Sequence, residues 1–220
     1  MTERTFDLIC FDVDGTLIEH PDGLVIWEVL NHRYTGNRQI NKERFEMFRS
    51  GKISYDEWVK LDVEGWMAAG ATREDVYDAV SEFELIEGAY DTVHELKRRG
   101  FKLGVISGTL DVMLDRLFPD HPFDDVYTNR LYFDDRGRLD RWRATPFDAK
   151  GKPDALRLIA DKHDIPLERA AYVGDGANDV PLLGVSGYFV AYEPRSKELE
   201  EGADLVIRGG DLRRLLDVFK

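Results

Sequence analysis

The sequence of 220 residues contains one cysteine, Cys10, and no long apolar stretch. A single cysteine excludes an intramolecular disulfide and a cysteine-rich zinc site, and within the run LICF its thiol is expected to be buried and inert. No run approaches the ~20 apolar residues of a membrane-spanning helix. The start, MTERTFDLIC, lacks the basic and apolar regions of a signal peptide. We therefore expect a cytoplasmic protein with no membrane partner.

Positive charge is also scarce. The 30 Lys and Arg residues are outnumbered by 43 Asp and Glu residues, which gives a formal net charge of −13. A nucleic-acid-binding protein needs a basic surface, so we expect no nucleic-acid partner. The same charge repels a phosphate-bearing ligand unless local cations offset it, and a divalent metal ion does so most simply.

Short apolar runs alternate with helical patterns over most of the chain. The expected strands cover residues 5–11, 101–107, 170–174, 187–192 and 203–207, and the expected helices cover residues 88–100, 153–165 and 179–187. This alternation predicts an α/β protein with a parallel sheet and right-handed crossovers. A hairpin is expected over 125–142, around a turn that contains Gly137. Ligands bind to such sheets at the carboxyl ends of the strands.

Residues 18–86 interrupt the alternation. Helical spacing is found over 40–51, 54–70 and 72–83, without a convincing strand, and the pairs Ser54/Glu57 and Thr72/Asp75 are typical of helix starts. We therefore expect a core domain of residues 1–17 and 87–220, with a helical domain of residues 18–86 inserted after the first strand. The large aromatic side chains of this insertion are expected in its interior rather than against a substrate: Trp27, Phe45, Phe48, Trp58 and Trp66.

Two short motifs follow the first two expected core strands. In Asp12-Val13-Asp14-Gly15-Thr16, residues two apart in an extended segment point to the same side, so both carboxylates can face one point. In Ser107-Gly108, a hydroxyl and a glycine amide can donate hydrogen bonds to a phosphate.

Two further motifs lie near the last expected core helix and strand. Lys152-Pro153 is predicted to begin a helix, where a lysine is unfavourable for the helix dipole unless an anion is nearby. The glycine-rich turn that holds Asp175, Asn178 and Asp179 offers oxygen ligands suited to a hard cation such as Mg²⁺.

Taken in this order, the four motifs resemble the signature of the haloacid dehalogenase-like (HAD) superfamily. The segments VISGTLD, NRLYFDDRGRL and VGDGANDVPLL are similar to those of its phosphoserine-phosphatase-like branch. The resemblance implies a Rossmann-like parallel sheet core, the HAD fold, with a small helical cap domain inserted after the first strand. It covers most of the chain, from Phe11 to Asp179.

The resemblance also implies a role for each motif residue. Asp12 would be the nucleophile that forms an aspartyl-phosphate, and Asp14 the general acid and base. The phosphoryl oxygens would be held by Lys152, Ser107, Gly108 and Asn178. Lys150 is the alternative lysine, because AKG also occurs in phosphoserine-phosphatase relatives, but Lys152-Pro153 better fits the start of the helix. The Mg²⁺ ligands would be Asp12, the backbone carbonyl of Asp14, Asp175 and Asp179.

The expected function is Mg²⁺-dependent hydrolysis of a small phosphorylated metabolite, a phosphomonoester, with phosphoserine as one candidate. Transfer of the phosphoryl group to an alcohol is an alternative, and a non-catalytic phosphate-binding module is another. Two family features are missing. Gly15 stands where phosphoserine phosphatases usually have Ser or Thr, and the glutamate and arginine that read the substrate's amino and carboxylate groups have no clear counterpart. Candidates for the glutamate are Glu19 and Asp22, and candidates for the cation are Lys42, Arg44, Arg49, Lys52 and Lys60.

Overall fold

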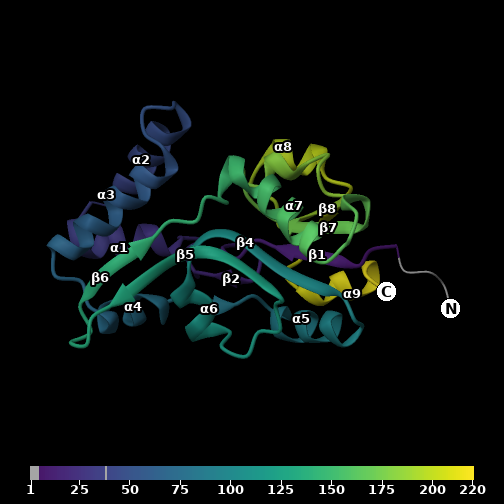
Figure 1. The fold of residues 1–220 in the computed structure, drawn as a ribbon, viewed down its shortest axis with the longest axis horizontal. Helices are drawn as coiled ribbons and strands as arrows, with labels where there is room; N and C mark the ends of the chain where they lie inside the picture. Colours follow the sequence, from purple (N-terminus) through teal and green to yellow (C-terminus); the bar gives the residue numbers. More distant parts are fainter. Residues whose placement is uncertain (1–4, 38) are drawn as a thin grey trace.

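A seven-stranded sheet forms the centre of the molecule, which a computed structural model describes over residues 5–37 and 39–220 (Figure 1). The strand order is β6-β5-β4-β1-β7-β8-β9, and every neighbouring pair except β5 and β6 is parallel. The strands are β1 (Leu8–Phe11), β4 (Lys102–Leu110), β5 (Asp125–Phe133), β6 (Leu139–Arg143), β7 (Ala170–Gly174), β8 (Tyr188–Tyr192) and β9 (Leu205–Ile207). The predicted α/β fold with a parallel sheet is confirmed.

Helices cover both faces of this sheet, which explains why its central strand is apolar throughout. In β1, Ile9 and Phe11 pack into one hydrophobic cluster, whereas Leu8 and Cys10 pack into the other. Figure 1 shows α5 (Ala89–Arg98) and α6 (Asp111–Leu117) on one face, and α7 (Lys152–Lys162) and α8 (Lys197–Gly202) on the other; α9 (Leu215–Val218) packs beside α5. Cys10 is buried as predicted, and burial raises the pKa of its thiol.

Four helices follow the first strand: α1 (Ile26–Thr35), α2 (Ile40–Arg49), α3 (Tyr55–Ala68) and α4 (Arg73–Val80). The three helices expected from spacing are all present, and α1 is an addition. Both expected helix starts are capping boxes, in which the Ser54 and Thr72 hydroxyls accept hydrogen bonds from the Glu57 and Asp75 amides, each at 3.2 Å.

A two-stranded antiparallel ribbon, β2 (Ile18–Glu19) and β3 (Glu84–Leu85), joins the two ends of this helical segment. The sequence did not predict it, because two residues are too few to show an alternating pattern. Ile18 pairs with Leu85, so the chain enters and leaves the segment at one place. We propose on this basis that residues 18–86 form a cap and residues 1–17 and 87–220 the core; residues 1–4 and Arg38 lie outside the described part of the chain.

The helix expected over 179–187 is wrong. Only Val180–Leu182 is helical there, as a 3-10 turn, and Gly184 then turns away with φ of +72°. A helix cannot continue through a left-handed residue. Further 3-10 turns are Ala149–Gly151, Leu167–Arg169 and Leu212–Arg214.

The predicted hairpin of β5 and β6 is hydrogen-bonded to the helical segment near the start of α4. The Leu139 amide donates to the Ala71 carbonyl at 2.9 Å, and the Arg73 amide donates to the Gly137 carbonyl at 2.7 Å. These bonds fix the start of α4 to the hairpin turn. None of the helices in the described part of the chain is both long and apolar enough to cross a membrane.

Candidate active site

The carboxyl ends of three neighbouring strands meet at one cavity of about 250 Å³. Asp12 follows β1, Ser107 lies in β4, and Asp175 follows β7. Parallel strands with a change of direction in strand order create a crevice at this position. Residues of the cap form the opposite wall, so the cavity lies between the cap and the core.

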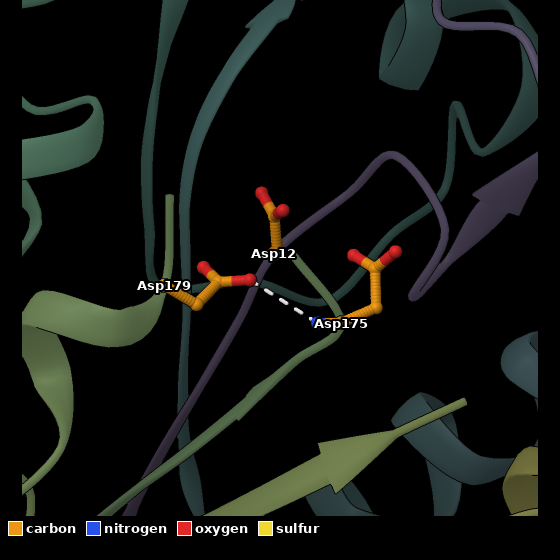
Figure 2. Close-up of side chains that lie close together, drawn as sticks. All are labelled: Asp12, Asp175 and Asp179. Atoms are coloured by element: carbon orange, nitrogen blue, oxygen red, sulfur yellow. Dashed lines mark hydrogen bonds between the residues drawn. The ribbon is translucent and has the colours of Figure 1, made fainter. Parts of the chain in front are cut away.

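Three buried aspartates form an acidic cluster (Figure 2). Oxygen atoms of Asp12, Asp175 and Asp179 lie within 4.8 Å of one another. The glycine-rich turn sets this arrangement, because the Asp175 and Gly176 amides donate to Asp179 Oδ2 at 3.1 and 3.0 Å. Three converging carboxylates suit a hard, oxygen-preferring cation such as Mg²⁺. The Asp14 side chain is not part of the cluster.

Lys152 is completely buried and supplies positive charge beside this cluster. Its Nζ lies 3.0 Å from Asp12 Oδ1 and donates to Asp179 Oδ1 at 2.6 Å and to the Tyr172 hydroxyl at 3.1 Å. Although burial lowers the pKa of Lys152, the charges of Asp12 and Asp179 more than reverse this, so the net shift is upward and the ammonium stays charged. Lys150, the other candidate, is exposed in the preceding turn.

Burial and mutual repulsion raise the pKa values of the other carboxyl groups. The pKa of Asp14 rises to about 7 through burial and the charge of Asp12, and the pKa of Asp175 rises to about 8 through burial and the charges of Asp12 and Asp179. The pKa of Asp179 is also raised, because burial outweighs the opposing charge of Lys152. The site therefore has more negative charge than Lys152 can balance, which favours binding of a further cation.

The segment after the middle of β4 forms part of the cavity wall. Ser107, Gly108 and Asn178 all line it, and Ser107 Oγ accepts a hydrogen bond from the Thr109 amide at 3.2 Å. A side chain at Gly108 would overlap the carboxylate of Asp148, to which Asn178 Nδ2 donates at 3.3 Å. Asp148 was not predicted, because an aspartate near the Lys-Gly-Lys stretch gives no signal of its own.

The geometry at Gly15 leaves no space for a side chain. Its φ is +83°, and a Cβ atom there would overlap Asp175 Oδ2. Arg195 occupies the adjoining space: its Nε lies 3.0 Å from Asp175 Oδ2, and its Nη1 donates to the Gly23 carbonyl at 3.4 Å. Arg195 thus joins the acidic cluster to the chain entering the cap. Arg195 was not predicted, because it lies beyond the last recognisable motif.

Two aromatic residues of the cap are linked by hydrogen bonds to the part of β4 around Gly108. Trp27 Nε1 donates to the Gly108 carbonyl at 2.9 Å. Asn129 Nδ2 donates to the same carbonyl at 2.7 Å and to the Tyr55 hydroxyl at 2.8 Å. Helix α1 is therefore hydrogen-bonded directly to the Gly108 carbonyl, next to the amide expected to bind phosphate, and α3 is joined to the same carbonyl through Asn129. Neither Tyr55 nor Asn129 was predicted, because their partner is contributed by a distant segment.

The expectation that the cap aromatics lie in its interior is confirmed for Trp27 and Trp66, whereas Phe45, Phe48 and Trp58 are only half-buried. Trp27, Phe45, Phe48 and Trp58 line the cavity, whereas Trp66 is fully buried and packs on Trp27 with ring centroids 5.2 Å apart. A helical pattern shows which side of a helix is apolar, but it does not distinguish a packed interior from an apolar cavity wall.

The residues considered for binding the amino and carboxylate groups of the substrate do not line the cavity. Glu19 and Asp22 are exposed, and neither lines the cavity. Lys42 and Lys52 line a separate surface hollow on α2 and the turn after it. The remaining cations pair with acids of the cap: Arg44 with Asp62, Arg49 with Glu46, and Lys60 with Glu64.

The fold and the site define a class of protein, a Rossmann-like α/β core with a buried aspartate-lysine site under a helical cap. The family model for haloacid dehalogenase-like hydrolases matches residues 6–187, and the chain belongs to this family. It is 34% identical over 201 residues to "Phosphoserine phosphatase SerB2" of Mycobacterium tuberculosis, covering 91% of this chain but 47% of that longer protein.

Other relatives match along their full length. The chain is 29% identical over 220 residues to phosphoserine phosphatase of Methanocaldococcus jannaschii, covering 99% of this chain and 100% of that one. Among solved structures, a substrate-bound phosphoserine phosphatase complex matches with a TM-score of 0.78 and 29% identity, and a phospho-aspartyl intermediate analogue of phosphoserine phosphatase matches with a TM-score of 0.77 and 29% identity. Both comparisons cover 99% of this chain and 100% of the other.

Proposed function

We propose that this chain is a phosphatase that hydrolyses a small phosphomonoester through an aspartyl-phosphate on Asp12. The observation that carries the proposal is the contact of Asp12 with the fully buried Lys152 at 3.0 Å, at the floor of a cavity that Ser107 and Gly108 also line. An anionic nucleophile beside a buried cation and hydrogen-bond donors is suited to phosphoryl transfer, in which positioning and charge neutralisation dominate.

In the first step, a carboxylate oxygen of Asp12 attacks phosphorus in line with the ester oxygen. The phosphorus-oxygen bond of the ester breaks, and Asp14 gives its proton to the departing alcohol. The Ser107 hydroxyl, the Gly108 amide and the Lys152 ammonium hold the phosphoryl oxygens. In the second step, Asp14 takes a proton from water, which attacks phosphorus, releases phosphate and restores Asp12.

We further propose Mg²⁺ as the cofactor, held by Asp12, the Asp14 carbonyl, Asp175 and Asp179. When bound, it supplies positive charge that offsets the carboxylates and the phosphoryl group. The carboxylate cluster supports this choice because its three oxygen ligands match the preference of a hard cation.

Hydrolysis of p-nitrophenyl phosphate with and without Mg²⁺ tests the proposal. We expect metal-dependent turnover that Asp12→Asn abolishes, because an amide is a very poor nucleophile. Asp22→Asn is the matched control and should leave turnover unchanged, since Asp22 is exposed and does not line the cavity. The absence of turnover with any divalent metal would overturn the proposal. Addition of glycerol separates the phosphotransferase alternative, which releases more p-nitrophenol than phosphate.

The names of the relatives make phosphoserine the first ester to assay. We propose a small metabolite rather than a nucleic acid or a membrane lipid, because the net charge of −13 disfavours polyanionic surfaces. The single cysteine, which is buried, is compatible with the cytoplasm.

A further inference from the structure

The wall that the cap contributes to the cavity is made largely of aromatic rings. Phe45, Phe48, Tyr55 and Trp58 all line it, and they pack on one another with ring centroids about 6 Å apart, from 5.8 to 6.1 Å. Trp27 adds a further ring from α1. Aromatic faces are electrically negative and attract organic cations, most strongly where water is excluded.

A carboxylate is buried within the same wall. Asp62 is 1% exposed and lines the cavity beside the rings. Its Oδ1 accepts from Asn31 Nδ2 at 3.0 Å and pairs with Arg44, and burial raises the pKa of Asp62 against the opposing effects of Arg44, Asn31 and Trp58. The Asp62 carboxylate therefore places an acidic group within the aromatic wall, beside Trp58.

The cavity offers little to a substrate carboxylate. Among the described residues that line it, the carboxylates are Asp12, Asp14, Asp62, Asp148 and Asp175, and the cationic side chain is Arg195, which already pairs with Asp175. Arg44 does not line the cavity, and it pairs with Asp62. A second negative group on the substrate would face the aromatic and acidic wall without a cation.

We propose, on the basis of the phosphatase function above, that the substrate is the phosphomonoester of an amino alcohol: its ammonium group lies against the aromatic wall and Asp62, and it carries no carboxylate. The phosphoryl group then occupies the Asp12 end of the cavity and the positive group the cap end. This assignment gives a role in substrate selection to the aromatic residues that α2 and α3 contribute to the cavity.

Matched pairs of esters test the proposal by comparing kcat/KM. The first pair is phosphocholine and neohexyl phosphate, in which carbon replaces the quaternary nitrogen; the second is phosphoethanolamine and n-propyl phosphate. We expect the cationic ester to be preferred by about tenfold or more in at least one pair, as for cation-aromatic contacts in a desolvated site. We also expect phosphoethanolamine to be hydrolysed at least as efficiently as phosphoserine.

Variants show whether the wall causes the preference. Trp58→Leu and, independently, Asp62→Asn should reduce the ratio of cationic to neutral ester towards one. Tyr90→Leu, at an exposed aromatic residue on α5, should leave it unchanged. The ratio is internal to each variant, so a partly folded preparation does not change its meaning. Two measurements still test recognition of the positive group if a wall variant fails to fold. They are the kcat/KM ratios of the wild type and the binding of the same esters to Asp12→Asn, measured by calorimetry.

The results separate this proposal from the phosphatase function. Turnover of p-nitrophenyl phosphate with no preference in either pair, or a clear preference for phosphoserine over phosphoethanolamine, overturns the amino-alcohol assignment and leaves the phosphatase intact. Loss of metal-dependent turnover on every ester overturns the phosphatase. Calorimetry on Asp12→Asn still tests cation recognition in that case, and equal affinities for both members of each pair contradict it.

Discussion

At the scale of single residues, Asp12 and Asp14 differ in environment although they are two positions apart. Asp12 pairs with Lys152, whereas Asp14 forms no ion pair with a cation in the described part of the chain, and its pKa is raised to about 7 by burial and by Asp12. A pKa near neutrality suits a group that must give a proton in one step and accept one in the next. The two residues thus fit the separate roles of nucleophile and acid-base catalyst.

The first prediction concerns Asp14. Asp14→Asn should lower kcat by roughly 10²–10⁴-fold, because it removes proton transfer in both steps. The loss should be larger for an alkyl phosphate than for p-nitrophenyl phosphate, since the nitrophenolate leaves readily without a proton. Steady-state kinetics on both esters checks this. Equal losses on the two would show that Asp14 does not protonate the leaving group.

A second prediction concerns Gly15, whose position beside Asp175 leaves no space for a side chain. Gly15→Ala should raise the Mg²⁺ concentration needed for half-maximal activity by roughly 10- to 100-fold, because Asp175 must move. Gly23→Ala is the control: Gly23 also has positive φ, +71°, but no atom lies within 4 Å of its added Cβ. If both variants have the same metal dependence, backbone strain rather than displacement of Asp175 is the cause.

At the scale of elements, the strands that carry the catalytic motifs were predictable because each is buried on both faces and therefore continuously apolar. The contacts between elements were not predictable. Trp27 and Asn129 both donate to the Gly108 carbonyl, and Tyr55 accepts from Asn129. These residues come from segments far apart in the chain, and no local pattern indicates such a meeting. The motif residues of the site were found because their chemistry is local, whereas Arg195 and the aromatic wall depend on tertiary packing.

A third prediction applies to the start of α6. Burial raises the pKa of Asp111 to about 6, above its ordinary value near 4, while its Oδ1 accepts hydrogen bonds from the Val112 and Leu131 amides. The folded protein therefore binds this proton more tightly than the unfolded chain. Its stabilising effect is complete below about pH 4 and is lost as the pH rises through about 6.

Thermal unfolding of the wild type and Asp111→Asn across this range checks the sign. The stability of the wild type relative to Asp111→Asn should fall as the pH rises from about 4 to 7, because Asp111 becomes charged in a buried position whereas the asparagine has no charge to bury. The control is Asp134→Asn at an exposed turn, where the Arg138 and Arg136 amides lower the pKa of Asp134, so its dependence has the opposite direction. A wild-type advantage at Asp111 that grows with pH contradicts the prediction.

At the scale of the whole molecule, the cap and core enclose a site whose carboxylates repel one another, within a chain of net charge −13. A cation that binds this site in the folded protein stabilises the entire fold by mass action. The fourth prediction is that Mg²⁺ raises the unfolding temperature, by an amount equivalent to about 2.7 kcal/mol at a hundred times its dissociation constant. Asp175→Asn should remove most of this increase, and Asp154→Asn, at an exposed residue of α7, should retain it. An equal increase in all three proteins would indicate a non-specific ionic effect.

The formation of an aspartyl-phosphate on Asp12 is the central claim, and chemical trapping tests it most directly. The enzyme is mixed with Mg²⁺ and a phosphomonoester, quenched in acid during turnover and reduced with borohydride, which converts an acyl phosphate to an alcohol. Peptide mass spectrometry should find homoserine in place of aspartate at position 12, only when both substrate and metal are present. Reduction at a different residue would contradict the account. So would the absence of any reduced residue under conditions in which the intermediate has been shown independently to accumulate during turnover.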